Sequence, residues 1–100
     1  MTLGVSEKQK DLILKVVASV FPDVEILLFG SRQRGNHKIT SDLDLCLKGK
    51  DKLDLSKWAQ LDELFTSSDL VFKVDLVDWH RITPEFQNII LKNCTQITRS

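Results

Sequence analysis

The sequence predicts an α/β (α+β) fold, with a small mixed sheet of three to four strands covered by helices. Two observations predict this fold. Short apolar runs rich in branched residues alternate with segments whose apolar residues recur at helical spacing. Their order is helix, strand, loop, strand, helix, strand, helix, which is typical of helices packed on a sheet. We expect the helices to cover one face of that sheet.

The first element is predicted to be an amphipathic helix. Ser6 and Gln9 have the spacing of a capping box, in which each side chain bonds the backbone N–H of the other residue. Apolar residues then recur every three or four positions, and Pro22 ends the pattern. The inward residues of this helix are Leu12, Ile13, Val16, Val17 and Val20.

Two strands are predicted next, on either side of a polar loop. The run VEILLFG, residues 24–30, is short, apolar and stopped by Gly30, as expected of a buried strand. The run DLDLCL, residues 42–47, alternates in character. Side chains of a strand point alternately to its two faces, so Asp42, Asp44 and Cys46 share one face and the leucines the other.

The second half of the chain adds a helix, a strand and a last helix. Asp54 can cap the first of these helices, and residues 72–78, FKVDLVD, form the third strand. Thr83 at the N-cap and Pro84 at the first helical position begin the last helix. The predicted inner stripes are Leu55, Trp58, Leu61, Leu64 and Phe65 in the first of these helices and Phe86, Ile89 and Ile90 in the last.

Composition narrows the function. Residues 1–100 fit a single domain, with fourteen basic and fourteen acidic residues and no net charge. We therefore expect no nucleic-acid partner and no membrane partner, and a cytoplasmic location. Cys46 and Cys94 lack metal-site spacing and are expected to be reduced, mostly packed thiols.

The loop that joins the first two strands carries groups that suit a polyphosphate. Its sequence, GSRQRGNHKIT, begins with Gly30 and Ser31 at the end of a strand. A glycine turn with free N–H groups and a hydroxyl can close around phosphate oxygens, and the guanidinium groups of Arg32 and Arg34 can bind them. The loop therefore predicts a triphosphate site.

Asp42 and Asp44 predict a metal site beside this loop. Two residues apart on a strand, they point the same way with Cα atoms about 7 Å apart. Hard carboxylate oxygens suit Mg²⁺, which takes substrate phosphates as further ligands. Two such ions can stabilise an attacking and a leaving oxygen together. Alone, an Asp-x-Asp pair usually marks a solvated strand face, and only its combination with the loop favours a site.

The stretch GSRQRGNHKITSDLD, with Gly30-Ser31, ten intervening residues and Asp42-x-Asp44, resembles the DNA polymerase beta-like nucleotidyltransferase superfamily. The small size is similar to its minimal nucleotidyltransferase (MNT) branch. The resemblance implies the polymerase beta-like fold and transfer of a nucleoside monophosphate from a nucleoside triphosphate to a hydroxyl, with Mg²⁺. It also implies that Ser31 touches the triphosphate, that Asp42 and Asp44 hold metal, and that KVDLVDW supplies a third carboxylate.

Strand parity chooses between Asp75 and Asp78 for that third carboxylate. Phe72, Val74 and Leu76 form the apolar set expected to face the helices, which places Asp75 on the opposite face with the other aspartates. There it could hold metal and accept the proton of the attacking hydroxyl, as the resemblance implies. Asp78 has core-face parity, so we expect it in a turn after the strand has ended.

Three kinds of function remain open from the sequence. MNT proteins are often paired with HEPN proteins in toxin–antitoxin modules, which implies an antitoxin that transfers AMP from ATP to a HEPN partner in a hetero-oligomer. A transferase for a small molecule is the first alternative, disfavoured because no second domain is expected to hold the acceptor. A non-catalytic nucleotide-binding subunit is the second, and it predicts lost carboxylates, whereas Asp42, Asp44 and Asp75 are all present.

Overall fold

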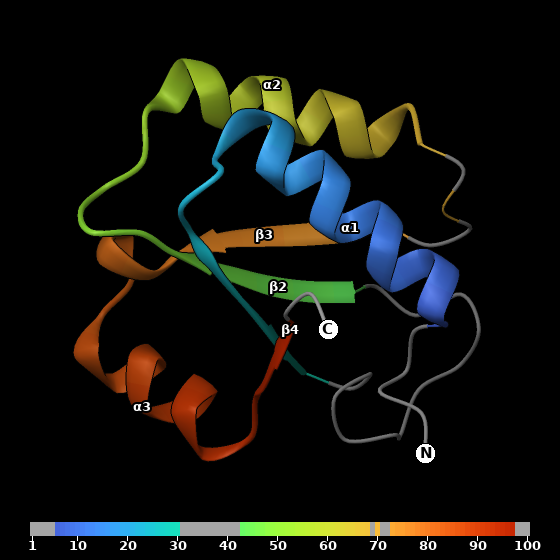
Figure 1. The fold of residues 1–100 in the computed structure, drawn as a ribbon. Coiled ribbons are helices and arrows are strands. Elements are labelled where there is room, and N and C mark those ends of the chain that lie inside the picture. Colours follow the sequence, from blue (N-terminus) through green and yellow to red (C-terminus); the bar gives the residue numbers. More distant parts are fainter. Residues whose placement is uncertain (1–5, 31–42, 69, 71–72, 98–100) are drawn as a thin grey trace.

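The computed structural model describes residues 6–30, 43–68, 70 and 73–97. Helices and strands are interspersed along the described chain (Figure 1). In order they are α1 (Glu7–Val20), β1 (Glu25–Phe29), β2 (Leu43–Lys48), α2 (Leu55–Thr66), β3 (Val74–Asp78), the 3₁₀ helix η1 (Trp79–Arg81), α3 (Pro84–Lys92) and β4 (Thr95–Ile97). None of these described helices is long and apolar enough to cross a membrane.

The strands form one mixed sheet in the order β3-β2-β1-β4. β1 pairs antiparallel with both β2 and β4, whereas β2 and β3 run parallel because α2 carries the chain back between them. The predicted fold class, a small mixed sheet with helices, is confirmed. The sequence did not locate β4, which is only three residues long.

The main core lies between the sheet and the helices α1 and α2, which both cover the same face (Figure 1). β2 contributes Leu43, Leu45 and Leu47, and all three side chains are fully buried. α1 contributes Ile13, Val17 and Val20, three of its predicted inward residues. The alternation read from the sequence therefore decides which face of β2 is the core face.

The second face of the sheet is also partly covered, so the expectation of helices on one face only was wrong. Leu27 of β1, Cys46 of β2 and Ile90 of α3 form a second buried cluster there. α3 crosses this face on its way from η1 to β4 (Figure 1). α3 covers this second face because consecutive residues of β1 are apolar, so that the strand presents apolar side chains to both faces of the sheet.

The predicted inner stripes of α2 and α3 were too wide. In α2, Leu61 and Phe65 are buried, whereas Leu55 is 64% exposed and Leu64 is 39% exposed. In α3, Ile90 is buried and Ile89 is 63% exposed. At 100° per residue each of these exposed residues lies about 80–100° from the centre of its buried stripe, on the flank of the helix.

The helix starts were predicted correctly. Ser6 Oγ accepts from the Gln9 N–H at 3.1 Å, and Gln9 Oε1 accepts from the Ser6 N–H at 2.8 Å, which completes the capping box. Asp54 caps α2 and Thr83 caps α3, with Pro84 in its first turn. These bonds satisfy N–H groups that have no partner inside the helix.

Asp78 anchors the loop before α2 to the end of β3. Its side chain is buried, with the residue 4% exposed, and it accepts hydrogen bonds from the Leu53 N–H at 2.9 Å, the His80 N–H at 3.0 Å and Arg81 Nε at 3.2 Å. Asp78 is the last residue of β3 and the N-cap of η1. The expectation that Asp78 lies in a turn after the strand has ended was wrong, because Asp78 is the last residue of β3 and its side chain caps the 3₁₀ helix that follows.

Because Asp78 satisfies three donors from a buried position, Asp78→Ala should lower the free energy of unfolding by about 2–4 kcal/mol. Urea unfolding followed by circular dichroism measures this loss. The matched control is Asp51→Ala, which removes an exposed carboxylate that, among the described residues, accepts from the adjacent Lys52 N–H alone; it should change stability by less than about 0.5 kcal/mol. Equal losses in the two variants would contradict the anchoring role.

Candidate active site

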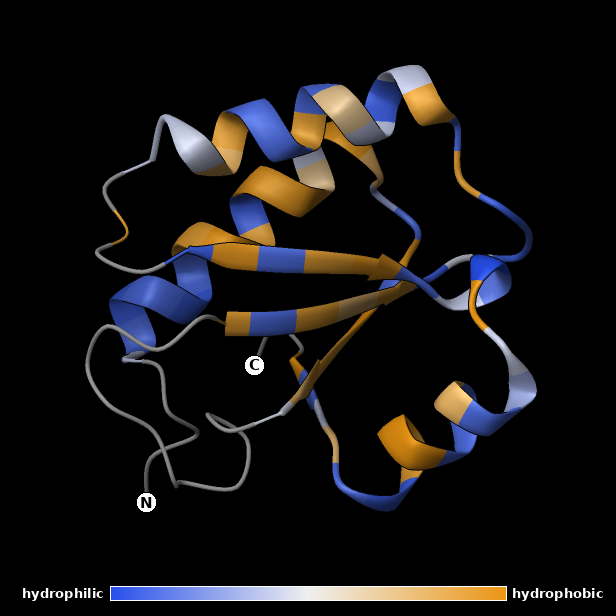
Figure 2. Ribbon diagram, turned by 180° about the vertical axis from the view of Figure 1, so that it is seen from behind, coloured by the Kyte–Doolittle hydropathy of each residue, from blue (hydrophilic) through white to orange (hydrophobic). Residues whose placement is uncertain are grey.

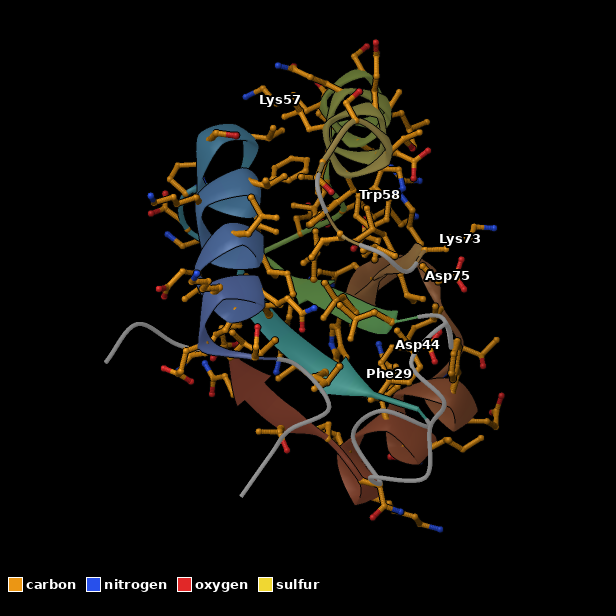
Figure 3. The ribbon with its side chains drawn as sticks, turned by 90° about the vertical axis from the view of Figure 1, so that its right-hand side faces the viewer. Phe29, Asp44, Lys57, Trp58, Lys73 and Asp75 are labelled. Carbon is orange, nitrogen blue, oxygen red and sulfur yellow. The ribbon has the colours of Figure 1, made fainter. Side chains whose placement is uncertain are left out.

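Three residues form one row across the sheet at the beginning of β2. In the strand register, Phe29 of β1 lies opposite Asp44 of β2, and Asp44 lies opposite Asp75 of β3. Residues directly opposite one another point to the same face, and neighbouring strands are about 4.8 Å apart. Figure 3 shows Asp44 and Asp75 on the side of the sheet away from α1, with Phe29 beside Asp44. This row is the centre of the candidate site.

The two carboxylates are set into strands that are otherwise mainly apolar. Figure 2 shows one hydrophilic band within the hydrophobic stretch of each of β2 and β3, and the two bands lie side by side. The residues that flank Asp44, Leu43 and Leu45, point to the opposite face and are fully buried. The core on one face thus fixes the position of the carboxylates on the other.

Gly30, which follows β1, brings the backbone against Asp44. Its φ is +82°, in the left-handed region that favours glycine. A Cβ built on Gly30 would overlap Oδ2 of Asp44 and would lie 3.0 Å from its Cγ. Only glycine permits both the turn and this approach, so the end of β1 and the Asp44 carboxylate are closely fitted to each other.

Lys73 adds a positive charge beside this row. Its Nζ lies 3.7 Å from Oδ1 of Asp75, whose side chain is 42% exposed. Sequence reasoning did not select Lys73, although its position two residues before Asp75 gives it the same strand parity. The backbone carbonyl of Lys73 also accepts from the Leu43 N–H at 2.8 Å, which extends the β2–β3 pairing toward the site.

The structure brings together three of the residues selected from the sequence, Gly30, Asp44 and Asp75. It places Asp78 three residues along β3, at the far end of the strand and with the parity of the core face. The other selected residues lie outside the described part of the chain. They are Ser31, Arg32, Arg34 and Asp42.

The donor set in this row fits a hard divalent cation. Asp44 and Asp75 present carboxylate oxygens from adjacent strands to the same face, and Mg²⁺ prefers such ligands together with phosphate oxygens and water. No group of three or more His, Cys, Asp or Glu residues gathers among the described residues. Asp42, the other predicted ligand, lies outside them.

Cys46 lies on the carboxylate face, two residues after Asp44, as strand parity predicted. Burial raises the pKa of its thiol to about 12, and the Asp78 carboxylate adds to the increase. The thiol is therefore protonated at neutral pH, and a protonated thiol is a poor nucleophile. Cys46 packs with Leu27 and Ile90 as part of the second apolar cluster.

Comparison with protein families identifies the family to which this fold belongs. Residues 13–100 match the family model described as "Polymerase beta, Nucleotidyltransferase". The chain belongs to this family. The resemblance seen in GSRQRGNHKITSDLD is thereby confirmed at the level of the whole chain.

Three relatives illustrate the branch of the family. The "Probable protein adenylyltransferase MntA" of Haemophilus influenzae is 34% identical over 90 residues, which are 90% of this chain and 79% of the relative. One chain in a crystal structure of a toxin–antitoxin with AMP-PNP is 27% identical to this protein, with a TM-score of 0.75 over 91% of this chain and 73% of that one. One chain in the structure of a tri-AMPylated HEPN toxin in complex with MNT antitoxin, from Shewanella oneidensis, is 25% identical, with a TM-score of 0.68 over 91% of this chain and 70% of that one.

These similarities make the chain a nucleotidyltransferase of the MntA type, whose structural neighbours are MNT–HEPN toxin–antitoxin complexes.

Because Gly30 combines a positive φ with close approach to Asp44, Gly30→Ala should displace that carboxylate and slow nucleotidyl transfer at least about tenfold. Gly49→Ala is the matched control, since its Cβ would meet first the flexible Leu53 side chain at 3.1 Å, without a positive φ. Steady-state transfer rates of both variants at 25 °C test this. Wild-type activity in Gly30→Ala would show that the close approach is not needed.

Proposed function

We propose that this protein transfers AMP from ATP to a hydroxyl group of a HEPN-type protein partner, as the antitoxin of a toxin–antitoxin pair. The reaction uses Mg²⁺ and releases pyrophosphate. In this proposal the partner protein is the substrate, and the two proteins form a hetero-oligomer.

The observation that carries the proposal is the pairing of Asp44 with Asp75 beside the Gly30 turn. Two carboxylates on neighbouring parallel strands point to one face, and a backbone turn closes against one of them. A structural role alone gives no reason to place like charges directly opposite each other in a sheet, because such pairs are destabilising. Cation-dependent chemistry on a polyphosphate gives such a reason.

The relatives support the nature of the substrate and of the partner. The first is named a probable protein adenylyltransferase, the second is a toxin–antitoxin structure with AMP-PNP, and the third contains a tri-AMPylated HEPN toxin with MNT antitoxin. AMP groups on the partner toxin of that third complex favour a protein acceptor over a small molecule here. ATP is accordingly the proposed nucleotide.

Each group of the site has a proposed role. Asp42, Asp44 and Asp75 would hold up to two Mg²⁺ ions, which in such sites neutralise phosphate charge and stabilise the attacking and leaving oxygens. The N–H groups of the Gly30-Ser31 turn and the Ser31 hydroxyl hold the triphosphate. The guanidinium groups of Arg32 and Arg34 bind its outer oxygens, as bidentate phosphate contacts commonly do.

The bond changes are those of a single displacement at the α-phosphorus of ATP. The hydroxyl oxygen of the acceptor forms a bond to that phosphorus, and the bond between the α-phosphorus and the bridging oxygen to the β-phosphate breaks. Asp75 accepts the hydroxyl proton, and pyrophosphate leaves with the bridging electron pair. Asp75 is suited to this role because its side chain is 42% exposed, so that an acceptor outside the sheet can reach it.

The proposed function predicts that a cognate HEPN protein is labelled when it is incubated with this protein, Mg²⁺ and ATP labelled in the α-phosphate. Asp44→Asn should abolish labelling without unfolding the protein, since it removes a metal ligand but keeps the side-chain shape. Asp62→Asn, on the exposed side of α2, is the matched control and should label normally. If the wild-type protein transfers no label, the proposed function is wrong.

The choice of Asp75 over Asp78 is tested by single-turnover transfer under identical Mg²⁺ and ATP. Asp75→Asn should lower the rate roughly a hundredfold or more, in the range that loss of a general base often costs, while nucleotide binding is largely kept. Asp78→Asn should be far milder, because Asp78 points to the core face at the far end of β3. Circular dichroism at the assay temperature checks that both variants are folded. A larger rate loss at Asp78 would refute the assignment.

A further inference from the structure

An aromatic pair borders the row of carboxylates. Phe29, opposite Asp44 in the strand register, meets Phe86 of α3 edge-to-face, with ring centroids 5.9 Å apart and an interplanar angle of 80°. The two residues come from different layers of the fold, since Phe29 ends β1 and Phe86 lies in the first turn of α3. Their contact therefore joins α3 to the edge of the candidate site.

The pair forms the partly exposed rim of the second apolar cluster. Leu27, Cys46 and Ile90 are buried within that cluster, whereas Phe29 and Phe86 are only half-buried. In the register Leu27 and Cys46 lie two positions further from the site, and Phe29 is in the same row as Asp44. Both residues thus keep part of their surface exposed, and Phe29 lies in the same row as Asp44.

The geometry of the pair suits a flat ligand. Because the rings stand nearly perpendicular, a planar group that stacks on one ring can turn its own edge toward the face of the other. A heteroaromatic base offers a π-face for stacking, and such stacking does not require hydrogen-bond readout. The other ring pair in the described chain, Phe21 with Trp58, belongs to the core on the opposite face of the sheet and cannot serve this site.

We propose that the Phe29–Phe86 pair binds the nucleobase of the nucleoside triphosphate. This inference rests on the proposed function, which places the reacting α-phosphate beside Asp44. The base is joined to that phosphate through one sugar, so it must bind close to Asp44. Phe29 stands directly opposite Asp44 and directly before the Gly30 turn, and is in position to receive it.

The test separates the base from the phosphates. Isothermal titration with Mg²⁺ compares AMP-PNP with inorganic tripolyphosphate, which has no base. Phe86→Leu keeps apolar volume in the cluster but removes the ring, and should weaken AMP-PNP binding at least about fivefold while tripolyphosphate binding is unchanged. Phe86→Tyr keeps the ring and should bind AMP-PNP as the wild type does.

The matched control applies the same substitution to the other ring pair. Phe21→Leu should leave the binding of both ligands unchanged, because Phe21 lies across the sheet. Equal AMP-PNP affinity of the wild type and Phe86→Leu would overturn the nucleobase site and leave the proposed function intact. An equal loss of affinity for AMP-PNP and tripolyphosphate in Phe86→Leu would also overturn the nucleobase site. Unchanged AMP-PNP affinity with slower transfer to the partner protein would overturn it too. A wild-type protein that binds neither ligand would overturn the proposed function as well.

Discussion

The burial of three leucines on one face of β2 is the constraint on which the candidate site depends. Leu43, Leu45 and Leu47 are fully buried beneath α1 and α2, so a shift of the strand by one residue would turn all three away from this core. Successive side chains alternate between faces, and Asp44 must therefore point away from this core. Val74 and Leu76 orient β3 in the same way and turn Asp75 to the same side. Core packing places the two carboxylates on the same face, although they repel each other.

That arrangement has an electrostatic cost, and the described side chains offset it only in part. Like charges directly opposite in a sheet are destabilising. Lys73 forms an ion pair with Asp75 at 3.7 Å, but both groups are substantially exposed, and such surface pairs contribute about 0–1 kcal/mol. A cation that binds the folded row stabilises the folded state by linkage. A bound cation is therefore expected to stabilise the row of carboxylates, whereas the leucine core that positions this row does not depend on a ligand.

Sequence patterns predicted the elements and the orientation of the carboxylates, because both depend on local rules. Capping by Ser6 and Asp54 and the alternation in β2 are legible in a few consecutive residues. The patterns did not predict which residues of a helix are buried where the burial depends on how much of the sheet that helix covers. Ile89 fits a helical stripe, yet α3 covers only a small part of the second face and leaves that side chain exposed. The Leu53 N–H, which donates to Asp78, is 25 residues away in the sequence, and this contact follows from tertiary packing.

Hydrogen bonds at the ends of β2 and β3 away from the site hold these two strands in register and leave the site itself open. Asp78 joins β3 to the loop before α2, while Arg81 donates to the Leu53 carbonyl at 3.0 Å and His80 Nε2 donates to the Gly49 carbonyl at 2.8 Å. These bonds fasten the segment that follows β2 to the segment that follows β3. Parallel strands fixed to each other at one end cannot slide at the other without breaking them. Asp78 lies about 10 Å along the strand from Asp75, and its buried bonds help to keep Asp44 and Asp75 opposite each other without occupying the space that a nucleotide and an acceptor need.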